Sequence, residues 1–402
     1  MSMRLVVDGI LLLLSILAAI PVTVLFAEIV AGVSRSIDND EPDMPHPRGA
    51  RLAVLMPAHD EAAGIAAAIA AIVPQLAARD RLLVVADNCT DETAAIACAE
   101  HAEVVERRDP QRRGKGYALD FGVRSLERDP PELVVMVDAD CLVTNGALER
   151  LARACLESGR PVQALYLMRA PDHASLGQRI AAFAWLVKNQ LRPLGAAAFG
   201  WPCHLMGTGM AFPWPLVRSA QLASSHLVED MQLGLDLAAT GAPPLFCPGA
   251  LVTSTFPVDR QGTLSQRMRW EQGHLSVIAT VGPRLLARAV IRRDVRLAGM
   301  VLDLMVPPLA ALVLFIIAIG AAAATWWAVG GSGWPLAVSA MAFGLLAVTV
   351  LLAWLREGRS IVSLPELLRL PLYVATKIPL YLRMLTRRQV EWVRTKRDEH
   401  SR

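Results

Sequence analysis

The sequence has little of what zinc fingers, disulfide-stabilised proteins and nucleic-acid-binding proteins require. Its 402 residues include 6 cysteines, and no two of them form a C-x-x-C pair or stand near histidine at zinc-finger spacing. The cysteines therefore predict reduced thiols with mainly structural roles. The formal net charge is only +3, and the sequence has no strip of interleaved aromatic and basic residues, so nucleic acid is not an expected partner.

Hydrophobic residues, in contrast, make up 54% of the sequence, and they concentrate in stretches that are almost free of polar groups. Residues 10–27, with flanks from 5 to 33, are long enough to cross a bilayer. A cleaved signal peptide is the competing interpretation, but the stretch is long and lacks a clear cleavage site before the polar segment. Residues 300–327 and 335–355 predict two further spans joined by a glycine-rich turn, and Asp303 is expected in the first turn of its span, near the interface.

The charge pattern predicts how the chain is arranged across the membrane. Arginines precede the second predicted span between positions 284 and 296 and follow the third at positions 356 and 359, so the positive-inside rule places the region between the first and second spans in the cytoplasm. We expect a transmembrane anchor at 1–34, a linker at 35–50, a cytoplasmic domain at 51–285, a basic segment and transmembrane hairpin at 286–355, and an interfacial amphipathic segment with a basic tail at 356–402. Whether residues 361–385 lie in the interface or span the membrane stays open, because prolines interrupt their apolar pattern.

The predicted cytoplasmic domain alternates between two kinds of pattern. Apolar runs at 52–56, 82–86 and 133–137 read as buried strands, and helical patterns such as 62–78 and 117–126 separate them. Strand and helix in alternation predict an α/β fold with a mostly parallel, doubly wound sheet of the kind that binds nucleotides.

The most informative polar residues follow the third of these strands. Asp138 and Asp140 come directly after the run 133–137, where ligands bind in open α/β sheets, and two carboxylates there can hold a hard divalent cation. Mg²⁺ typically combines one or two carboxylates with substrate phosphates, which favours a nucleotide diphosphate as companion. Taken alone, such a pair is more often a solvated turn.

Other candidate residues are individually weaker. Lys115 lies between two glycines at the start of a helix, an arrangement that can bind phosphate but occurs equally as a solvated turn. Glu229 and Asp230 open another helix, where acids often only compensate the helix dipole. The remaining candidates include the acids at strand ends, which are Asp60, Glu61 and Asp87, and Gly207 in a glycine-rich bend. They also include three residues on one helix face, Gln266, Arg269 and Trp270.

With these residues in one order, the chain resembles the membrane-bound family 2 glycosyltransferases of GT-A fold, which are relatives of the cellulose, chitin and hyaluronan synthases. The resemblance covers roughly residues 50–285. Asp87 matches the aspartate that contacts uridine, Asp138 and Asp140 match the DxD motif that binds the metal, and Asp230 matches the catalytic base of the ED pair. Gln266, Arg269 and Trp270 match the QxxRW motif, and Lys115 matches a lysine between glycines near the nucleotide. The resemblance implies a GT-A type, Rossmann-like cytoplasmic domain beside transmembrane helices.

The sequence departs from the large synthases at three points. Val228 stands where they commonly have threonine, the membrane region is smaller, and the Gly207 bend lacks the aromatic and cysteine residues that they place beside the acceptor. These departures speak against a long translocation channel and leave sugar transfer itself unaffected.

The resemblance implies an inverting, metal-dependent hexosyltransferase that uses a nucleotide-sugar donor, expected to be a UDP-sugar, with Mg²⁺ or Mn²⁺ as cofactor. Asp230 and Arg269 would be catalytic, Asp138 and Asp140 would hold the metal, and two further sets would bind the substrates. The donor set is Asp60, Glu61, Asp87, Lys115 and Asp138, and the acceptor set is Gly207, Glu229, Gln266 and Trp270.

The expected acceptor is a lipid-linked saccharide used for exopolysaccharide or another glycoconjugate, at the inner membrane of a bacterium, with a polysaccharide assembly complex as a further partner. Direct glycosylation of a ceramide- or diacylglycerol-type lipid and a short chitin-type processive synthase are alternatives of the same chemistry. A catalytically silent scaffold is an alternative of a different class, but it is disfavoured because every essential acid is present.

Overall fold

The computed structural model describes residues 3–37, 50–224, 228–256 and 260–386, and of residues 260–267 and 385–386 it describes the backbone only. The chain forms two compact units, and each is described by itself. The first, called the sheet unit, comprises Ser36–Pro171, Pro202–Gly273 and Val390–Arg402. The second, called the helical unit, comprises Met1–Arg35, Asp172–Trp201 and His274–Gln389.

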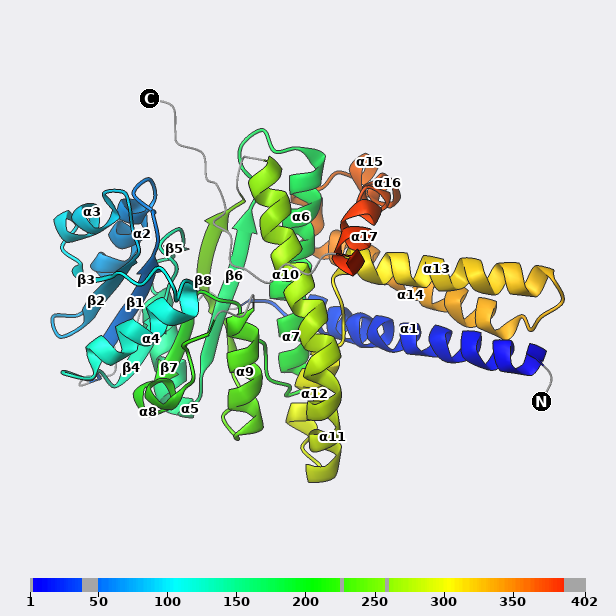
Figure 1. Ribbon diagram of the computed structural model, residues 1–402, viewed down its shortest axis with the longest axis horizontal. Coiled ribbons are helices and arrows are strands. Elements are labelled where there is room, and N and C mark those ends of the chain that lie inside the picture. Colours follow the sequence, from blue (N-terminus) through cyan, green and yellow to red (C-terminus); the bar gives the residue numbers. More distant parts are fainter. Residues whose placement is uncertain (1–2, 38–49, 225–227, 257–259, 387–402) are drawn as a thin grey trace. The chain divides into compact units, whose positions relative to one another are not determined.

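The sheet unit is built on an eight-stranded sheet with the strand order β3-β2-β1-β4-β7-β6-β8-β5 (Figure 1). Strands β3, β2, β1 and β4 are parallel to one another, as are β6 and β8, whereas β7 and β5 pair antiparallel with their neighbours. The predicted α/β class with a mostly parallel sheet is therefore confirmed. The strands are β1 (Leu52–Ala58), β2 (Arg81–Asp87), β3 (Glu103–Arg107), β4 (Leu133–Met136), β5 (Leu142–Val143), β6 (Val162–Arg169), β7 (Met210–Pro213) and β8 (Leu245–Thr255).

The central strands form where the sequence has short apolar runs. Every residue of β4 is buried, and Val54 of β1 pairs with Leu82 on one side and with Val135 on the other. Strands buried on both faces need apolar residues at consecutive positions, and these runs provide them. Because β1, β2 and β4 are parallel, their carboxyl ends meet at one edge of the sheet, and the polar segments that follow them begin there.

Helices cover the sheet and close its core. Helix α4 buries Leu119, Val123 and Leu126 in a cluster with Leu55 of β1 and residues of neighbouring strands. The approach is close, since a Cβ atom at Gly122 of α4 would lie 2.3 Å from a methyl group of Leu55. The helices of this unit are α2 (Ile65–Ile72), α3 (Thr93–Ala99), α4 (Lys115–Leu126), α5 (Ala147–Ser158), α8 (Trp214–Ser219) and α9 (Glu229–Ala239), and α10 (Arg260–Thr280) continues from this unit into the helical unit.

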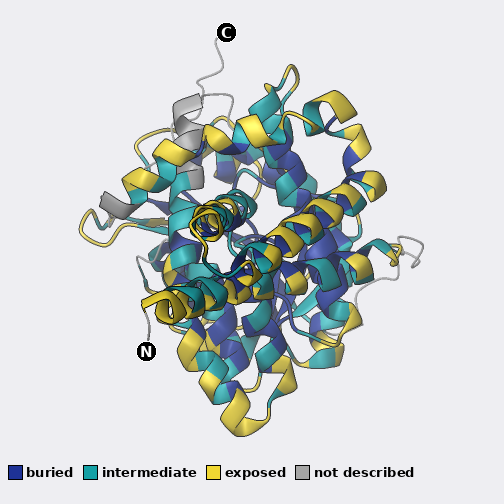
Figure 2. Ribbon diagram, turned by 90° about the vertical axis from the view of Figure 1, so that its right-hand side faces the viewer, coloured by how far each residue is buried: buried dark blue, intermediate teal, exposed yellow. Residues whose placement is uncertain are grey.

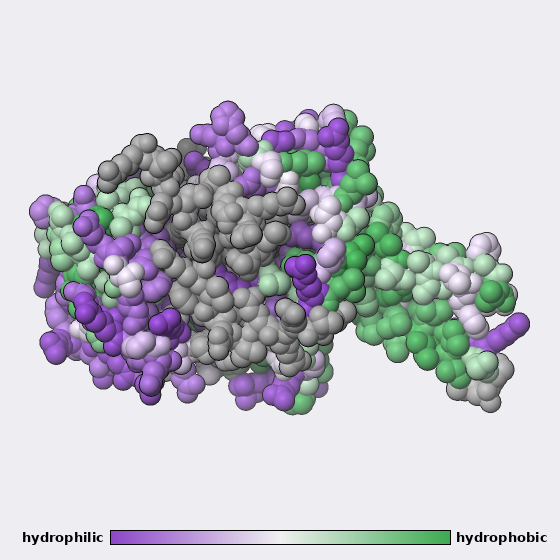
Figure 3. Space-filling model, turned by 45° about the horizontal axis from the view of Figure 1, so that its top comes forward, coloured by the Kyte–Doolittle hydropathy of each residue, from purple (hydrophilic) through white to green (hydrophobic). Residues whose placement is uncertain are grey.

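Among the residues that the structure describes, the helical unit contains three helices long and apolar enough to cross a membrane, which are α1 (Met3–Val33), α13 (Leu309–Ala328) and α14 (Trp334–Arg356). Their surface is largely apolar in Figure 3, and seen end-on in Figure 2 their outer faces are exposed. The prediction of three such stretches is confirmed. A bent pair, Met268–Thr280 with Gly282–Arg292, would make a fourth span if it were continuous.

The prediction of where the second membrane span starts was wrong. Residues 295–304 form a separate helix, and the apolar helix begins only at Leu309, because Pro307 and Pro308 interrupt the backbone hydrogen bonds of a continuous helix. Asp303 consequently does not lie in the first turn of a span, but in α12 (Val295–Leu304), where it is buried.

The other helices of this unit are shorter. They are α6 (Leu176–Leu186), the π-helical turn η2 (Val187–Leu191), α7 (Arg192–Ala198), α11 (Gly282–Arg292), α15 (Leu364–Leu367), α16 (Leu370–Ala375) and α17 (Ile378–Thr386). The segment 361–385 is thus broken at its prolines into short helices, as expected, and its position in the interface stays a prediction.

A buried cluster of charges joins α1, α7 and α12. Arg192 donates a hydrogen bond from Nε to Glu28 over 3.0 Å and forms an ion pair with Asp303, and these side chains are at most 8% exposed. Helices α1 and α7 touch closely here, since a Cβ atom at Gly195 would lie 1.9 Å from the carbonyl oxygen of Glu28.

Candidate active site

The paired aspartates lie at the sheet edge where β4 ends. The backbone N–H of Asp138 donates to Thr208 Oγ1 over 3.1 Å, and Ser254 Oγ donates to Asp140 over 3.2 Å, so the loop before β7 and the end of strand β8 hold these residues in place. Ligand atoms of Asp138, Asp140 and Cys141 all lie within 4.8 Å of one another. Burial raises the pKa of Asp138, and the ammonium group of Lys115 offsets this only in part.

Lys115, the first residue of α4, reaches into this group of acids. Its ammonium group forms an ion pair with Asp138 and donates to the carbonyl oxygen of Gly207 over 2.8 Å. Burial lowers the pKa of Lys115, but the carboxylates of Asp138 and Glu229 raise it more, so that the net pKa lies above the ordinary value. Lys115 is therefore a permanent positive charge in this part of the site.

Glu229 and Asp230 form the first turn of α9 and face the same lysine. A Cβ atom at Gly207 would lie 3.2 Å from Asp230 Oδ2 and 3.6 Å from Lys115 Nζ, so that this glycine allows the loop to pass between them. Burial and the adjacent charge of Asp230 raise the pKa of Glu229 to about 7. Near neutral pH, Glu229 therefore exchanges protons readily.

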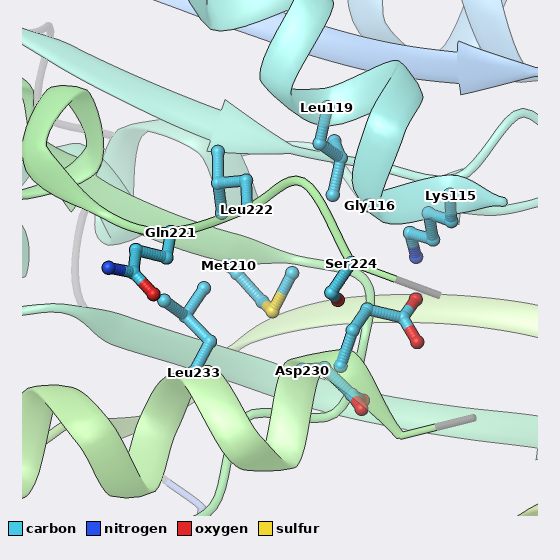
Figure 4. A pocket seen from close by; sticks show the side chains of 10 residues that line it. Lys115, Gly116, Leu119, Met210, Gln221, Leu222, Ser224, Asp230 and Leu233 are labelled. Atoms are coloured by element: carbon cyan, nitrogen blue, oxygen red, sulfur yellow. The ribbon is translucent and has the colours of Figure 1, made fainter. Parts of the chain in front are cut away.

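A shallow recess, part of it open to solvent, lies beside these residues. In Figure 4, Lys115 and Gly116 enter it from α4, and Asp230 and Leu233 enter from α9. Its remaining lining combines the apolar side chains of Leu119, Met210 and Leu222 with the polar side chains of Gln221, Ser224 and Glu229. Its enclosed space, about 20 Å³, holds little more than one water molecule.

The donor set of acids lies along the same sheet edge. Asp87 ends β2 and accepts hydrogen bonds from Arg107 over 2.6 Å and from Asn88 over 2.9 Å, while burial raises its pKa. Asp60 follows β1 and accepts a hydrogen bond from the backbone of Thr90 over 2.6 Å, which joins the loops after β1 and β2.

The residues at the end of β4 fit a hard divalent cation. Asp138 and Asp140 offer carboxylate oxygens, the ligands that Mg²⁺ and Mn²⁺ prefer. Burial and the adjacent carboxylates raise the pKa of the Cys141 thiol well above its ordinary value, so this group stays protonated and is a poor ligand.

A model of the family described as "Glycosyltransferase like family 2" matches residues 47–273, more than half of the chain. The chain belongs to this family. The protein is therefore a glycosyltransferase, and the resemblance inferred from the motifs is confirmed.

Individual relatives match this family 2 glycosyltransferase less extensively. A catalytic chain of the UDP-forming cellulose synthase from Dictyostelium discoideum is 33% identical over 78 residues, which are 19% of this chain and 7% of that protein. The chain thus spans only a small part of that relative's length.

Two solved glycosyltransferases resemble the structure at low identity. A mannosyltransferase from Pyrobaculum calidifontis, in complex with GDP-Man and Mn²⁺, is 16% identical with a TM-score of 0.49, and the match covers 85% of this chain and 98% of that one. Glucosyl-3-phosphoglycerate synthase from Mycobacterium tuberculosis, in complex with Mn²⁺, UDP-glucose and phosphoglyceric acid, is 23% identical with a TM-score of 0.38, over 56% of this chain and 78% of that one.

The QxxRW residues of this glycosyltransferase lie on α10. The guanidinium group of Arg269 is attracted by the carboxylate of Glu229, which places this arginine in the electrostatic environment of the site. Trp270 is half-buried on the same helix, whereas the side chain of Gln266 lies outside the described residues.

The structure thus brings most of the predicted site residues into two groups. The first group contains Lys115, Asp138, Asp140, Gly207, Glu229 and Asp230. The second contains Asp60 and Asp87. Glu61 follows Asp60 in the chain, and its backbone N–H donates to Thr93 Oγ1 over 2.8 Å. The roles of these residues in binding and catalysis stay predictions.

Sequence reasoning missed two supporting residues. Gln163 of β6 is fully buried, donates to Thr208 O over 2.9 Å and accepts from the Met206 N–H over 2.8 Å, so it fixes the loop that carries Gly207. A single amide in an otherwise apolar buried strand was the signal for it. Arg107, the partner of Asp87, gave no such signal, because it ends an ordinary edge strand.

Proposed function

We propose that this glycosyltransferase transfers a hexose from a nucleotide diphosphate sugar, a UDP-sugar, to a lipid-linked saccharide at the cytoplasmic face of a bacterial inner membrane, with inversion at the sugar. The observation that carries the proposal is that Lys115 contacts both Asp138, of the DxD pair, and the Gly207 loop that passes beside Asp230. A candidate metal-binding pair and a candidate base therefore lie around one cation, in a chain that also contains three membrane-spanning candidates.

The proposed chemistry is a single displacement. Asp230 takes the proton of the acceptor hydroxyl, the acceptor oxygen forms a bond to the anomeric carbon, and the bond from that carbon to the diphosphate breaks. Lys115 and Arg269 stabilise the negative charge that develops on the leaving diphosphate. Asp138 and Asp140 would hold Mg²⁺ or Mn²⁺, which supplies further positive charge to the same phosphates.

The substrate-binding residues follow from their positions. Asp60, Glu61 and Asp87, at the ends of β1 and β2, are proposed to bind the nucleoside, as nucleotides bind at the carboxyl ends of parallel strands. Gly207, Glu229, Gln266 and Trp270 are proposed to bind the acceptor. The recess beside Asp230 supports this assignment because its lining is both apolar and polar.

The membrane helices support a lipid-linked acceptor and a polysaccharide assembly complex as partner. Two exposed leucines, Leu368 (74% exposed) between α15 and α16 and Leu372 (71% exposed) on α16, and the arginines around α11 suit a cytoplasmic, anionic lipid surface. The same features also fit direct glycosylation of a membrane lipid, which is the second candidate.

The test is sugar transfer by the purified protein in detergent. A panel of UDP- and GDP-sugars is supplied with Mn²⁺ or Mg²⁺ and with extracted membrane lipids, and incorporation of labelled sugar into the lipid fraction is measured. Asp230→Asn should lose about 10²–10⁴-fold in rate if Asp230 is the general base. The matched control is Asp236→Asn, an exposed acid on the same helix, which should retain full activity.

The proposal fails if no donor is turned over with any lipid fraction, or if Asp230→Asn is as active as the parent. Label that appears in a simple glycolipid, and not in a lipid-linked saccharide, would favour the second candidate.

A further inference from the structure

Lys115 occupies the carboxylate that a metal ion would need. Its ammonium group pairs with Asp138, which is one of the two acids that fit the cation. An ammonium group and a divalent cation repel each other at contact distance in a half-buried site, so that each weakens the binding of the other to one carboxylate. The two cations therefore compete for Asp138.

We propose that Lys115 acts as an internal counter-ion that occupies Asp138 until the diphosphate of the donor draws it away, so that metal and donor bind cooperatively. The inference rests on the proposed function, because it names the nucleotide diphosphate as the group that attracts the lysine. It assigns to Lys115 control over when the metal binds, in addition to any contact with the donor.

The surroundings of Lys115 favour movement of its side chain over movement of its backbone. At Gly116, a Cβ atom would lie 2.5 Å from Leu222 O and 2.7 Å from Ser224 O, so the start of α4 is packed tightly against this loop. The side chain itself is 21% exposed and ends a flexible four-carbon stem. Rotation of this stem is enough to carry the ammonium group from a carboxylate to a nearby phosphate.

The Gly207 carbonyl gives the lysine a second anchor. It accepts a hydrogen bond from Lys115 over 2.8 Å, opposite the ion pair with Asp138. Neutral carbonyl and carboxylate together hold the ammonium group well, so only a strong competitor displaces it. A diphosphate does so as an acceptor for the lysine, and a divalent cation at saturating concentration does so by taking its place at Asp138. Binding of the donor and binding of the metal are then linked, and each raises the affinity of the protein for the other by the same factor.

The test measures Mn²⁺ binding to the full-length protein in detergent, by electron paramagnetic resonance of free Mn²⁺, with and without UDP. Lys115→Met removes the competing charge at nearly constant length. Without UDP, this variant should bind Mn²⁺ about tenfold more tightly than the parent, since an opposite charge in contact changes the cation affinity of a carboxylate by at least this factor. The gain in Mn²⁺ affinity caused by UDP should be smaller than in the parent.

Two controls separate the role of this ammonium group from general electrostatics. Arg113→Met removes the same charge from an exposed position two residues earlier, and its Mn²⁺ affinity should match that of the parent. Lys115→Arg keeps the charge and should keep the weak Mn²⁺ binding. Unchanged or weaker Mn²⁺ binding by Lys115→Met without UDP would overturn the inference.

A measurement on the parent protein covers the case in which Lys115→Met does not fold. Mn²⁺ alone should displace Lys115 from Asp138 and raise the rate at which its amine is reductively methylated, as followed by mass spectrometry. An unchanged rate at saturating Mn²⁺ overturns the inference.

Failure of the proposed function has a different signature. If the protein uses no nucleotide donor, UDP leaves Mn²⁺ binding of the parent unchanged, but Lys115→Met still binds Mn²⁺ more tightly without UDP.

Discussion

Two clusters of charged side chains in the described part of the chain are alike in composition and different in enclosure. Each has a basic residue facing more than one acid, Arg192 with Glu28 and Asp303 in the helical unit, and Lys115 with Asp138 and its neighbours in the sheet unit. The first cluster is at most 8% exposed and lies between three helices, whereas Lys115 and Asp138 are 21% and 29% exposed and lie on a helix start and a loop.

This difference separates a structural role from a functional one. Charges fixed on three helices, with α1 and α7 in backbone contact, have no room to exchange partners. Charges at a half-exposed sheet edge can exchange one partner for another, as the proposed binding of metal and diphosphate requires. The planar guanidinium of Arg192 suits the first task, and the flexible stem of Lys115 suits the second.

The strongest test of this comparison is Arg192→Met. It should destabilise the helical unit by about 3–5 kcal/mol, because two carboxylates would remain buried without their partner. The measurement is the yield and thermal unfolding of monodisperse protein in detergent. The matched control is Arg296→Met, an exposed arginine on α12 that should leave stability unchanged.

A second variant sharpens the result. If unpaired charge is the cause, adding Glu28→Gln and Asp303→Asn to Arg192→Met should restore most of the stability. A triple variant as unstable as Arg192→Met would show that packing, and not charge, explains the loss.

The next effect concerns the support of the open cluster. Gln163→Met should cost about 1–3 kcal/mol, because it leaves the Thr208 carbonyl and the Met206 N–H buried without their partner. It should also lower the rate of sugar transfer, since the Gly207 loop is no longer held. Gln111→Met, at an exposed position, is the control for the chemical change. Equal unfolding midpoints of the two variants would contradict the assignment.

The elements of the sheet unit could be predicted because each depends on neighbouring residues. Runs such as 52–56 and 133–137 are apolar at consecutive positions, and the acids that follow them meet because parallel strands end at one edge. The position of Asp138 and Asp140 was therefore accessible from the sequence.

The side-chain pairings could not be predicted in this way. Arg192 lies 164 residues from Glu28 and 111 residues from Asp303, and nothing local in the sequence links them. The ion pair of Lys115 with Asp138 likewise depends on how α4 packs against the sheet. Even the local proline pair at 307–308 was missed, because the apolar pattern runs through it and hides the helix boundary.

A smaller effect is expected at the loop between Lys115 and Asp230. Gly207 has φ +92°, and Gly241 has φ +98° with nothing within 4 Å of an added Cβ atom. Alanine at either position should cost about 1–2 kcal/mol of stability, because a side chain strains a backbone with positive φ. Only Gly207→Ala should also lower activity, since its Cβ would lie 3.2 Å from Asp230 Oδ2. Equal activity of the two variants would exclude contact at Gly207 as a constraint on the site.

The smallest effect is a pH dependence of stability that arises in the open cluster around Lys115. Burial and the charge of Asp230 raise the pKa of Glu229 from 4.5 to about 7, so the folded protein binds this proton more tightly than the unfolded chain does. The resulting stability is fully present below pH 4.5 and is lost as the pH rises through about 7. Glu229→Gln has no such proton, so it should gain stability relative to the parent as the pH rises from 5 to 8. The measurement is thermal unfolding of both proteins with a chelator present, and Glu157→Gln, an exposed acid on α5, is the control. If parent and Glu229→Gln lose stability in parallel from pH 5 to pH 8, the open cluster does not hold a proton at Glu229, and ionised carboxylates alone surround Lys115.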